Sequence, residues 1–488
     1  MILLAAAYLC FAFGTDLSRP LLGNFAGRSV PYAMFAENFL RGVPLWMPTA
    51  DLLVNGQKTV CLLDWPLVSA AASLMKLVVR ALSLETAGRV FSVLTTLGGA
   101  WYFYKLTNRL FEKKDLNPAL SPALYLFSPL ALIYGQSFQN EAVSLYLLVL
   151  SAWFLYKEPG IPSTRRIVLA AFNFSVAETA RLHFALFLLP LLFRVGEGTR
   201  GRERALRLML FLAASQALPV LWYGYCYYGT QAYDSVIWSL WFQLGSKTAP
   251  LAEYAHADFL KTLAKNCLLY PFAGIGVFAF AAGLAAFIRE KKSFFLWWGV
   301  SSALLLLLFA KKAVEHNYYL MPVLPLAAWA MAAGCGKKAV RLFFLTAYTA
   351  AGLFFSSKVL LTVPESERGL LSDAQAVRES VPVGARVIYA GYGLPMMYYS
   401  SREGWNSDLS RHLSPYLRQN FLLHHREEEL KEIETAPTPE ARLGYFTAQQ
   451  AGYLVVNRRV PGLEEALAGP IRSRGVLRED ERFILVSL

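Results

Sequence analysis

Apolar segments separated by polar loops run through most of this chain. A helix that crosses a bilayer needs about 20 apolar residues, with a range of roughly 17–25. Eleven segments approach this length and predict eleven crossings: residues 2–14, 88–104, 119–134, 142–156, 167–177, 182–193, 206–228, 267–288, 294–310, 318–334 and 342–355. Segments 167–177 and 182–193 are short, and one long broken crossing is the alternative interpretation of that pair.

The composition fits a membrane protein better than a soluble enzyme. Of the 488 residues, 56% are hydrophobic and only 17% are charged, whereas soluble domains carry about 25% charged residues. This balance excludes a disordered chain. The five cysteines show no Cys-x-x-Cys spacing, so the sequence predicts neither a disulfide framework nor a zinc site.

Basic residues fall in every second loop, which sets the predicted orientation because the positive-inside rule places such loops in the cytosol. The five basic clusters are Lys105/Arg109/Lys113/Lys114, Lys157/Arg165/Arg166, Arg194/Arg200/Arg202/Arg204/Arg207, Arg289/Lys291/Lys292 and Lys337/Lys338/Arg341. The intervening loop 136–141 has no basic residue. We therefore attribute the net charge of +13 to cytosolic loops and not to nucleic-acid binding.

The first external loop is predicted to be large. We expect residues 2–14 to be an uncleaved first crossing, because the segment lacks a basic start and a good cleavage site; a signal peptide is the alternative. The loop then covers residues 15–87. Its apolar segment 66–82 carries Lys76 and Arg80, and we expect a juxtamembrane or re-entrant helix there.

The composition changes from Pro364 onward. Residues 385–390, 453–457 and 483–486 predict strands, and residues 410–433 and 462–468 predict helices. The predicted fold class is a mainly α polytopic membrane protein of about eleven transmembrane helices. A transmembrane domain over 1–360 is followed by a small external α/β domain over 364–488.

The polar residues of interest gather at the predicted outer ends of the spans. Such residues are functional candidates because ionisable groups are costly at bilayer depth. The candidates are Asp16, Asp64, Glu141, Glu178, Arg181, His183, Lys311, Lys312, Glu315, His316, Tyr318 and Tyr319. Their common placement suits a donor whose lipid tail stays in the bilayer while its charged head lies at the outer surface.

The chemistry of a phosphate-linked sugar donor would use these residue types. Cations such as Arg181, Lys311 or Lys312, together with His183, would neutralise the phosphate, and the carboxylate of Asp16 would orient or deprotonate an acceptor hydroxyl. Structural roles remain the alternative for each residue. Acids at helix starts complement the helix dipole, lysines and arginines snorkel to head groups, and tyrosines belong to interfacial belts. Trp238 and Trp241 are expected to be belt residues.

Five stretches resemble motifs of the GT-C superfamily of membrane glycosyltransferases, in the branch of the protein mannosyltransferases and lipid A aminoarabinose transferases. They are Asp16 with the following GRSVPYAMFAENF at 27–39, LDWPL at 63–67, GRVFS at 88–92, the stretch 128–141 ending in Glu141, and EHNYYLMP at 315–322. The segment YYSSREGW at 398–405 also resembles the external domain of bacterial members. The likeness covers roughly residues 1–360 and is patchy between the motifs.

The resemblance implies a polyprenyl-phosphate sugar donor, a GT-C-like fold and an inverting transfer at the outer membrane face. It implies Asp16 as the catalytic or acceptor-orienting acid and Glu141 in the second acidic position. It places Arg28 in a motif helix and Asp64 in the step that closes the first loop. The chain departs from the family pattern at Trp65, where aminoarabinose transferases have a lysine, so Arg181, Lys311 or Lys312 would have to bind the phosphate.

No Asp-x-Asp motif lies near Asp16, so we predict no required metal or other cofactor, although Asp16 and Glu141 could share a divalent cation. The expected partners are a lipid-linked sugar and a glycan, lipid or protein acceptor, in a bacterial inner membrane. Two alternatives stay open from the residues alone. One is a transporter or flippase of a lipid-linked sugar, which would usually show paired repeats. The other is a non-catalytic membrane assembly or sensor protein.

Overall fold

The computed structural model describes the whole chain except residues 24–25, 55, 112–118, 233–253, 255, 336–337, 408, 410–426 and 437. Its described residues form two compact units. Unit 1 contains Met1–Arg19, Ala81–Gly224 and Gln243–Leu361, and unit 2 contains Pro20–Arg80, Tyr225–Phe242 and Thr362–Leu488. Trp238 and Trp241 lie outside the described residues, and their role in an interfacial belt stays a prediction.

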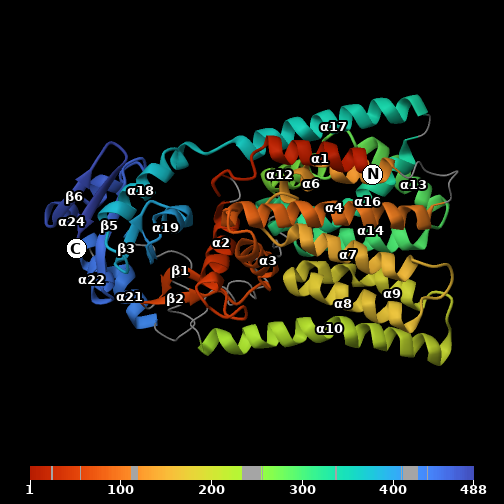
Figure 1. Cartoon of the computed structure of the whole chain (residues 1–488), viewed down its shortest axis with the longest axis horizontal. Helices are drawn as coiled ribbons and strands as arrows, with labels where there is room; N and C mark the ends of the chain where they lie inside the picture. Colours follow the sequence, from red (N-terminus) through yellow and green to blue (C-terminus); the bar gives the residue numbers. More distant parts are fainter. Residues whose placement is uncertain are drawn as a thin grey trace. The chain divides into compact units, whose positions relative to one another are not determined.

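Unit 1 is helical, and Figure 1 shows long helices such as α4, α7 and α14 within it. Its elements are α1 (Ile2–Gly14), α4 (Leu84–Leu110), α5 (Leu120–Leu126), α6 (Pro129–Tyr134), α7 (Glu141–Tyr156), α8 (Thr164–Ala180), η1 (Leu182–Phe187), α9 (Leu188–Gly196), α10 (Gly201–Ala232), α12 (Ala257–Leu269), α13 (Val277–Arg289), α14 (Ser293–Leu308), α15 (Ala310–Glu315), η4 (Asn317–Val323), α16 (Leu324–Gly334) and α17 (Lys338–Leu361). The last residues of α10, from Tyr225, belong to unit 2.

Three of the expected spans are broken by local sequence. Segment 119–134 divides into α5 and α6 because Ser128 caps α6, accepting a hydrogen bond from the Ala131 N–H at 3.1 Å, with Pro129 at the first helical position. Segment 267–288 divides into α12 and α13, and Ala273 between them has a φ of +49°. Segment 318–334 begins as the 3₁₀ helix η4 and continues as α16.

Segments 167–177 and 182–193 belong to separate helices, α8 and the pair η1 and α9. Arg181 has an extended backbone between them, with a φ of −153°. By length and composition, the stretches Gly201–Gly229 and Ala339–Leu361 are long and apolar enough to cross a membrane. Most other apolar helices of unit 1 are shorter, because these breaks divide the hydrophobic segments. The count of eleven crossings stays a prediction.

The helices of unit 1 pack through small residues. Helix α13 lies against α16, and a Cβ added to Gly283 would overlap the backbone carbonyl of Ala330. The glycine therefore allows the two helices to contact each other backbone to backbone. Contacts of this kind are typical of helices that associate in membranes, where small residues permit close packing.

Unit 2 contains a mixed seven-stranded sheet with helices. Its elements are α2 (Ala26–Leu40), β1 (Thr49–Val54), β2 (Gln57–Val60), α3 (Leu67–Val78), η5 (Glu365–Glu367), α18 (Leu370–Ser380), β3 (Arg386–Ala390), α19 (Leu394–Ser400), β4 (Gly404–Asn406), α21 (Glu427–Thr435), α22 (Pro439–Ala448), β5 (Ala451–Asn457), α23 (Leu463–Ala466), α24 (Ala468–Arg472), β6 (Gly475–Glu479) and β7 (Phe483–Ser487). The strand order is β2-β1-β4-β3-β5-β7-β6, with β1, β4, β3 and β5 parallel.

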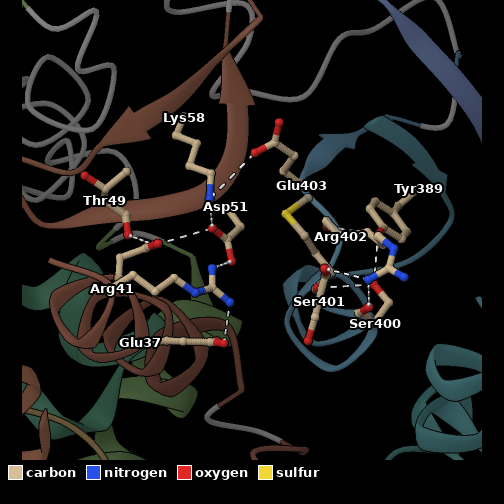
Figure 2. Close-up of polar contacts among 12 residues, drawn as sticks. Glu37, Arg41, Thr49, Asp51, Lys58, Tyr389, Ser400, Ser401, Arg402 and Glu403 are labelled. Carbon is tan, nitrogen blue, oxygen red and sulfur yellow. Dashed lines mark hydrogen bonds and ion pairs between the residues drawn. The ribbon is translucent and has the colours of Figure 1, made fainter. Parts of the chain in front are cut away.

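The sheet joins the first loop to the C-terminal segment. Leu52 of β1 pairs with Gly404 of β4. Figure 2 shows Lys58 of β2 between Asp51 at 2.7 Å and Glu403 at 3.6 Å, so one ammonium group bridges a carboxylate from each region. Arg41 at the end of α2 extends this network to Glu37.

The strands expected at 385–390, 453–457 and 483–486 are confirmed as β3, β5 and β7. Their side chains, with Trp405 and Phe446, form a continuous buried core. Strands β1, β2, β4 and β6 were not expected from the sequence. Of the helix expected at 410–433, residues 410–426 lie outside the described part of the chain and the rest falls in α21; the helix expected at 462–468 divides into α23 and α24.

Candidate functional site

Asp16 follows helix α1 directly and lies exposed in a strained turn. Its φ of +59° is in the left-handed region, which aspartate tolerates better than most residues. Oδ1 of Asp16 accepts hydrogen bonds from the backbone N–H of Ser18 at 2.8 Å and from the Ser18 hydroxyl at 2.5 Å. These bonds, the hydroxyl first, and the charges of Arg19 and Arg89 hold the pKa of Asp16 below its ordinary value of 3.8. The side chain is therefore ionised at neutral pH.

Buried polar groups fix the turn that carries Asp16. Nη1 of Arg89 donates to the Leu17 carbonyl at 2.9 Å and also to the Arg19 carbonyl. The Thr15 hydroxyl donates to Gln136 Oε1 at 2.6 Å, and Arg19 Nη1 donates to the same oxygen at 3.2 Å. A buried guanidinium and a buried amide from distant parts of unit 1 thus hold both ends of the turn.

Helix α4 supports the neighbouring turn between α6 and α7. Gly88 and Ser92 lie one helical turn apart and face this turn. The ring of Phe138 packs over Gly88, where an added Cβ would come within 2.6 Å of ring carbons, and the Ser92 hydroxyl donates to the Ser137 carbonyl at 2.6 Å. The resemblance motif at 88–92 therefore has a structural role, because it packs against the turn that connects Gln136 to Glu141.

Glu141 and Arg181 form a buried ion pair. Glu141 is the first residue of α7 and is 0% exposed, and Arg181, which follows α8, is 2% exposed. Nη2 of Arg181 donates to Glu141 Oε1. The guanidinium also lies over the ring of Tyr318, with Cζ 5.3 Å from the ring centroid. A buried pair of this kind needs good geometry to offset the loss of hydration of both charges.

A group of stacked aromatic rings at η1 and the start of η4 contacts this pair through Tyr318. The His183 ring lies 4.5 Å from the Tyr319 ring, and Tyr318 stacks on Tyr319 at 5.1 Å. The His316 ring also stacks on the Tyr318 ring, at 5.3 Å between the ring centroids. The resemblance motif at 315–322 thus supplies three stacked rings beside a buried cation.

The structure brings most of the predicted unit 1 candidates together. Direct contacts connect Glu141, Arg181, His183, His316, Tyr318 and Tyr319. Asp16 is connected to this group indirectly. Gln136 accepts a hydrogen bond from the turn that carries Asp16, and it lies five residues before Glu141 in the chain. In α15, Lys312 pairs with Glu315 at 2.6 Å on a partly exposed helix that also carries Lys311.

Arg28 and Asp64 meet in unit 2. Nη2 of Arg28 lies 3.4 Å from Asp64 Oδ2, and the Tyr32 hydroxyl donates to the same oxygen at 3.1 Å. Asp64 is buried, and Arg28 and Tyr32 lie one helical turn apart on α2. The two resemblance motifs at 27–39 and 63–67 are therefore in direct contact.

Sequence analysis missed several residues of the site. Arg89 and Gln136 lie inside the motifs at 88–92 and 128–141 without a predicted role of their own, and the sequence pattern does not single out Arg19. The signal that could have found them is a buried Arg or Gln within an otherwise apolar segment, which must find polar partners. Across the residues that the structure describes, no group of three or more His, Cys, Asp or Glu side chains is placed to hold a metal ion.

Comparison of the fold with solved structures gives matches over 93–100% of the chain. The structure of ArnT from Cupriavidus metallidurans bound to undecaprenyl phosphate has a TM-score of 0.67 and 15% identity, covering 100% of this chain and 97% of that one. The Archaeoglobus fulgidus oligosaccharyltransferase complex with Zn and sulfate has a TM-score of 0.59 and 13% identity, covering 93% and 68%. The arabinofuranosyltransferase AftD from Mycobacteria has a TM-score of 0.58 and 12% identity, covering 100% and 39%.

No family model and no curated protein matches the sequence. At these identities the structural likeness establishes the fold. The chain has the fold of GT-C glycosyltransferases, which confirms the resemblance predicted from its motifs.

Proposed function

We propose that this protein is a multi-pass membrane glycosyltransferase that moves a sugar from a polyprenyl-phosphate donor to an acceptor, with inversion, at the outer face of a bacterial inner membrane. One observation carries the proposal: the full-length fold match to a GT-C enzyme whose structure holds undecaprenyl phosphate. In this orientation residues 364–488 lie outside, and the sequence pattern of basic loops supports it.

The transfer is a single displacement at the sugar's anomeric carbon. A bond forms between that carbon and the acceptor oxygen while the bond to the phosphate oxygen breaks, and the electron pair stays on the polyprenyl phosphate. The acceptor proton passes to a carboxylate or to water. Because the leaving group is already good, the protein mainly has to bind the phosphate and orient the acceptor.

We assign the acceptor-orienting role to Asp16. Its lowered pKa makes it a weak base but a fully charged hydrogen-bond acceptor at neutral pH. Both of its described hydrogen bonds go to Oδ1, which leaves Oδ2 on the exposed side chain as an acceptor for a substrate hydroxyl. Arg89 and Gln136 act as positioning residues, because they hold the turn and not the substrate.

We assign binding of the donor's phosphate head group to Arg181. Glu141 fixes the guanidinium of Arg181, and the Tyr318 ring supports its face. Guanidinium groups suit phosphate because their planar N–H groups match its oxygens. His183, His316 and Tyr319 line this region, and Lys311 and Lys312 on α15 are further candidates for the phosphate. In unit 2, Arg28 and Asp64 are proposed as substrate-binding residues.

The first test is native mass spectrometry of the protein purified in mild detergent. We expect a bound polyprenyl phosphate or polyprenyl-phosphate sugar, retained by wild type and reduced in Arg181→Lys. Absence of any such species, also after addition of undecaprenyl phosphate, would count against the donor class.

The second test separates transfer from transport. Donor lipid labelled in its sugar is supplied with membrane acceptors, and the formation of a new glycosidic bond is measured. We expect Asp16→Asn to lose transfer while the exposed control Asp258→Asn keeps it. Movement of intact donor across a sealed bilayer without a new bond would support a flippase instead.

A further inference from the structure

A basic hollow lies at the ends of α4 and α7 that are remote from the candidate site. It has a volume of about 340 Å³ and is lined by Lys105, Asn108, Arg109, Trp153, Lys157 and Glu158. Pockets for small ligands span about 300–1,000 Å³, so the hollow has room for a phosphate-containing head group. None of these residues has a role in the proposed glycosyl transfer.

The hollow and the candidate site occupy opposite ends of the same two helices. Twelve residues of α7 separate Glu141 from Trp153, which is about 18 Å of helix at 1.5 Å per residue. On α4, Arg89 and Lys105 are about 24 Å apart by the same rise. The two helices pack along each other, as Figure 1 also shows. By the orientation proposed above, the hollow faces the cytosol.

Aromatic rings hold the lysines of the hollow in place. The ammonium of Lys105 lies 5.1 Å from the Trp101 ring, 5.4 Å from the Tyr102 ring and 5.4 Å from the Trp153 ring, and that of Lys157 lies 5.3 Å from Trp153. Cation–π contacts of this kind restrict the side chains, so less conformational entropy is lost when an anion binds.

The charge of the hollow is left uncompensated by the described acids. Glu158 pairs with Arg166, outside the lining. Among the described residues, no carboxylate pairs with Lys105, Arg109 or Lys157. Basic residues in another predicted cytosolic loop do have acidic partners: Arg194 lies 2.8 Å from Glu197, and Arg207 lies 2.9 Å from Glu203. Three cations and one carboxylate line the hollow, and that carboxylate pairs with Arg166, so the remaining positive charge favours an external anion.

A stripe of exposed apolar residues on α4 leads toward Lys105 in the lining of the hollow. Leu94 and Trp101 of α4 lie seven residues apart on one helix face and are 56% and 44% exposed, and Lys105 follows one turn later. Exposed apolar residues leading to a tryptophan and then to a cation are the pattern expected where acyl chains give way to head groups. A lipid could lay its tails along this stripe with its phosphate in the hollow.

We propose that the hollow binds the phosphate head group of an anionic glycerophospholipid from the cytoplasmic leaflet, such as phosphatidylglycerol. Basic pockets between transmembrane helices on the cytoplasmic side bind head groups of this class. A zwitterionic phosphatidylethanolamine is a poorer ligand, because its ammonium group would be repelled by three cations. This inference rests on the membrane placement in the proposed function but not on the sugar transfer.

The test compares three proteins in nanodiscs that contain equal amounts of phosphatidylglycerol and phosphatidylethanolamine. The protein is released from the nanodiscs, and the lipids that remain bound to it are identified by native mass spectrometry. Wild type is compared with the triple variant Lys105→Gln/Arg109→Gln/Lys157→Gln and with a matched control, Arg200→Gln/Arg202→Gln/Lys291→Gln, which removes three exposed charges elsewhere in the cytosolic loops. The single variants Lys157→Gln and Lys157→Arg cover the case in which the triple variant does not fold.

We expect wild type and the control to retain phosphatidylglycerol preferentially. Removal of one cation should weaken retention about fivefold, and removal of all three roughly a hundredfold. Lys157→Arg should keep the preference. Equal retention in the triple variant and wild type would overturn the site. Binding of inorganic phosphate by wild type without any preference for phosphatidylglycerol would show that the hollow takes a free anion and would overturn the lipid assignment. Transfer activity, measured separately, keeps a failure of this proposal distinct from a failure of the enzymatic one.

Discussion

The buried pair of Glu141 and Arg181 allows a quantitative test of unit 1. Glu141→Gln removes the carboxylate that the guanidinium faces, in a place where both side chains are essentially inaccessible to water. Removal of one partner of a buried pair costs about 3–5 kcal/mol, whereas replacement of both partners by uncharged residues is often close to neutral. We therefore expect Glu141→Gln and Arg181→Met each to destabilise unit 1 by about 3–5 kcal/mol. The double variant should lose less than either single variant, which is a coupling of at least about 3 kcal/mol.

Cys335 reports the opening of unit 1. This residue caps α16 and is 3% exposed, so a maleimide reaches it only when the local structure opens. A loss of 3 kcal/mol raises the open population by about a hundredfold, since 1.4 kcal/mol corresponds to a factor of ten. Labelling of Cys335 is followed by mass spectrometry of its peptide.

The control is Glu197→Gln, whose carboxylate is 45% exposed and pairs with Arg194. Exposed pairs contribute about 0–1 kcal/mol, so its labelling rate should change by less than about fivefold. A double variant that labels as fast as the product of the two single effects would refute the reasoning, because the two charges would then act independently.

Three further predictions concern the turn regions. Gly88→Ala should destabilise unit 1 by about 1–3 kcal/mol, because the new methyl group meets the Phe138 ring, whereas Gly14→Ala, which has open space around it, should not; labelling of Cys335 measures both. Arg89→Lys should lower kcat of transfer about tenfold or more with KM for the donor little changed, because the shorter lysine side chain does not place its nitrogen where Nη1 of Arg89 donates to the Leu17 and Arg19 carbonyls. Ser18→Ala should raise the pKa of Asp16 toward 3.8, because it removes the main stabilising hydrogen bond of the carboxylate. The acid limb of the pH profile of kcat/KM should then move to higher pH. An unchanged acid limb would mean that ionisation of Asp16 does not control the rate.

The helices and the motif residues were largely predictable from the sequence, while their breaks and partners were not. The length of an apolar segment predicts where a span lies. The division of 119–134 depends instead on Ser128, which caps α6, and a hydrophobicity pattern does not detect such a cap. Glu141 and Arg181 were predicted as candidates from their place at the predicted outer ends of spans. Their direct pairing depends on how α7 and α8 pack, and a single sequence does not contain that information.

The turn of Asp16 shows a second limit. The acid itself was predicted from its place after an apolar segment. Arg89 and Gln136, which fix that turn, are far away in sequence and were predictable only as buried polar groups in need of partners. In unit 2, strand β4 gave no signal because three residues are too few to show an alternating pattern.

The pairing of β1 with β4 sets an order in which the protein can be made. Ribosomes add about 5–20 residues per second, so the chain between Leu52 and Gly404 takes roughly 20–70 s to emerge. During that interval β1 has only its hairpin partner β2, and its other edge is open to pairing with another chain. The first loop therefore waits, incompletely folded, for the last quarter of its own polypeptide, and a truncated product that ends before β4 would keep that edge unpaired permanently.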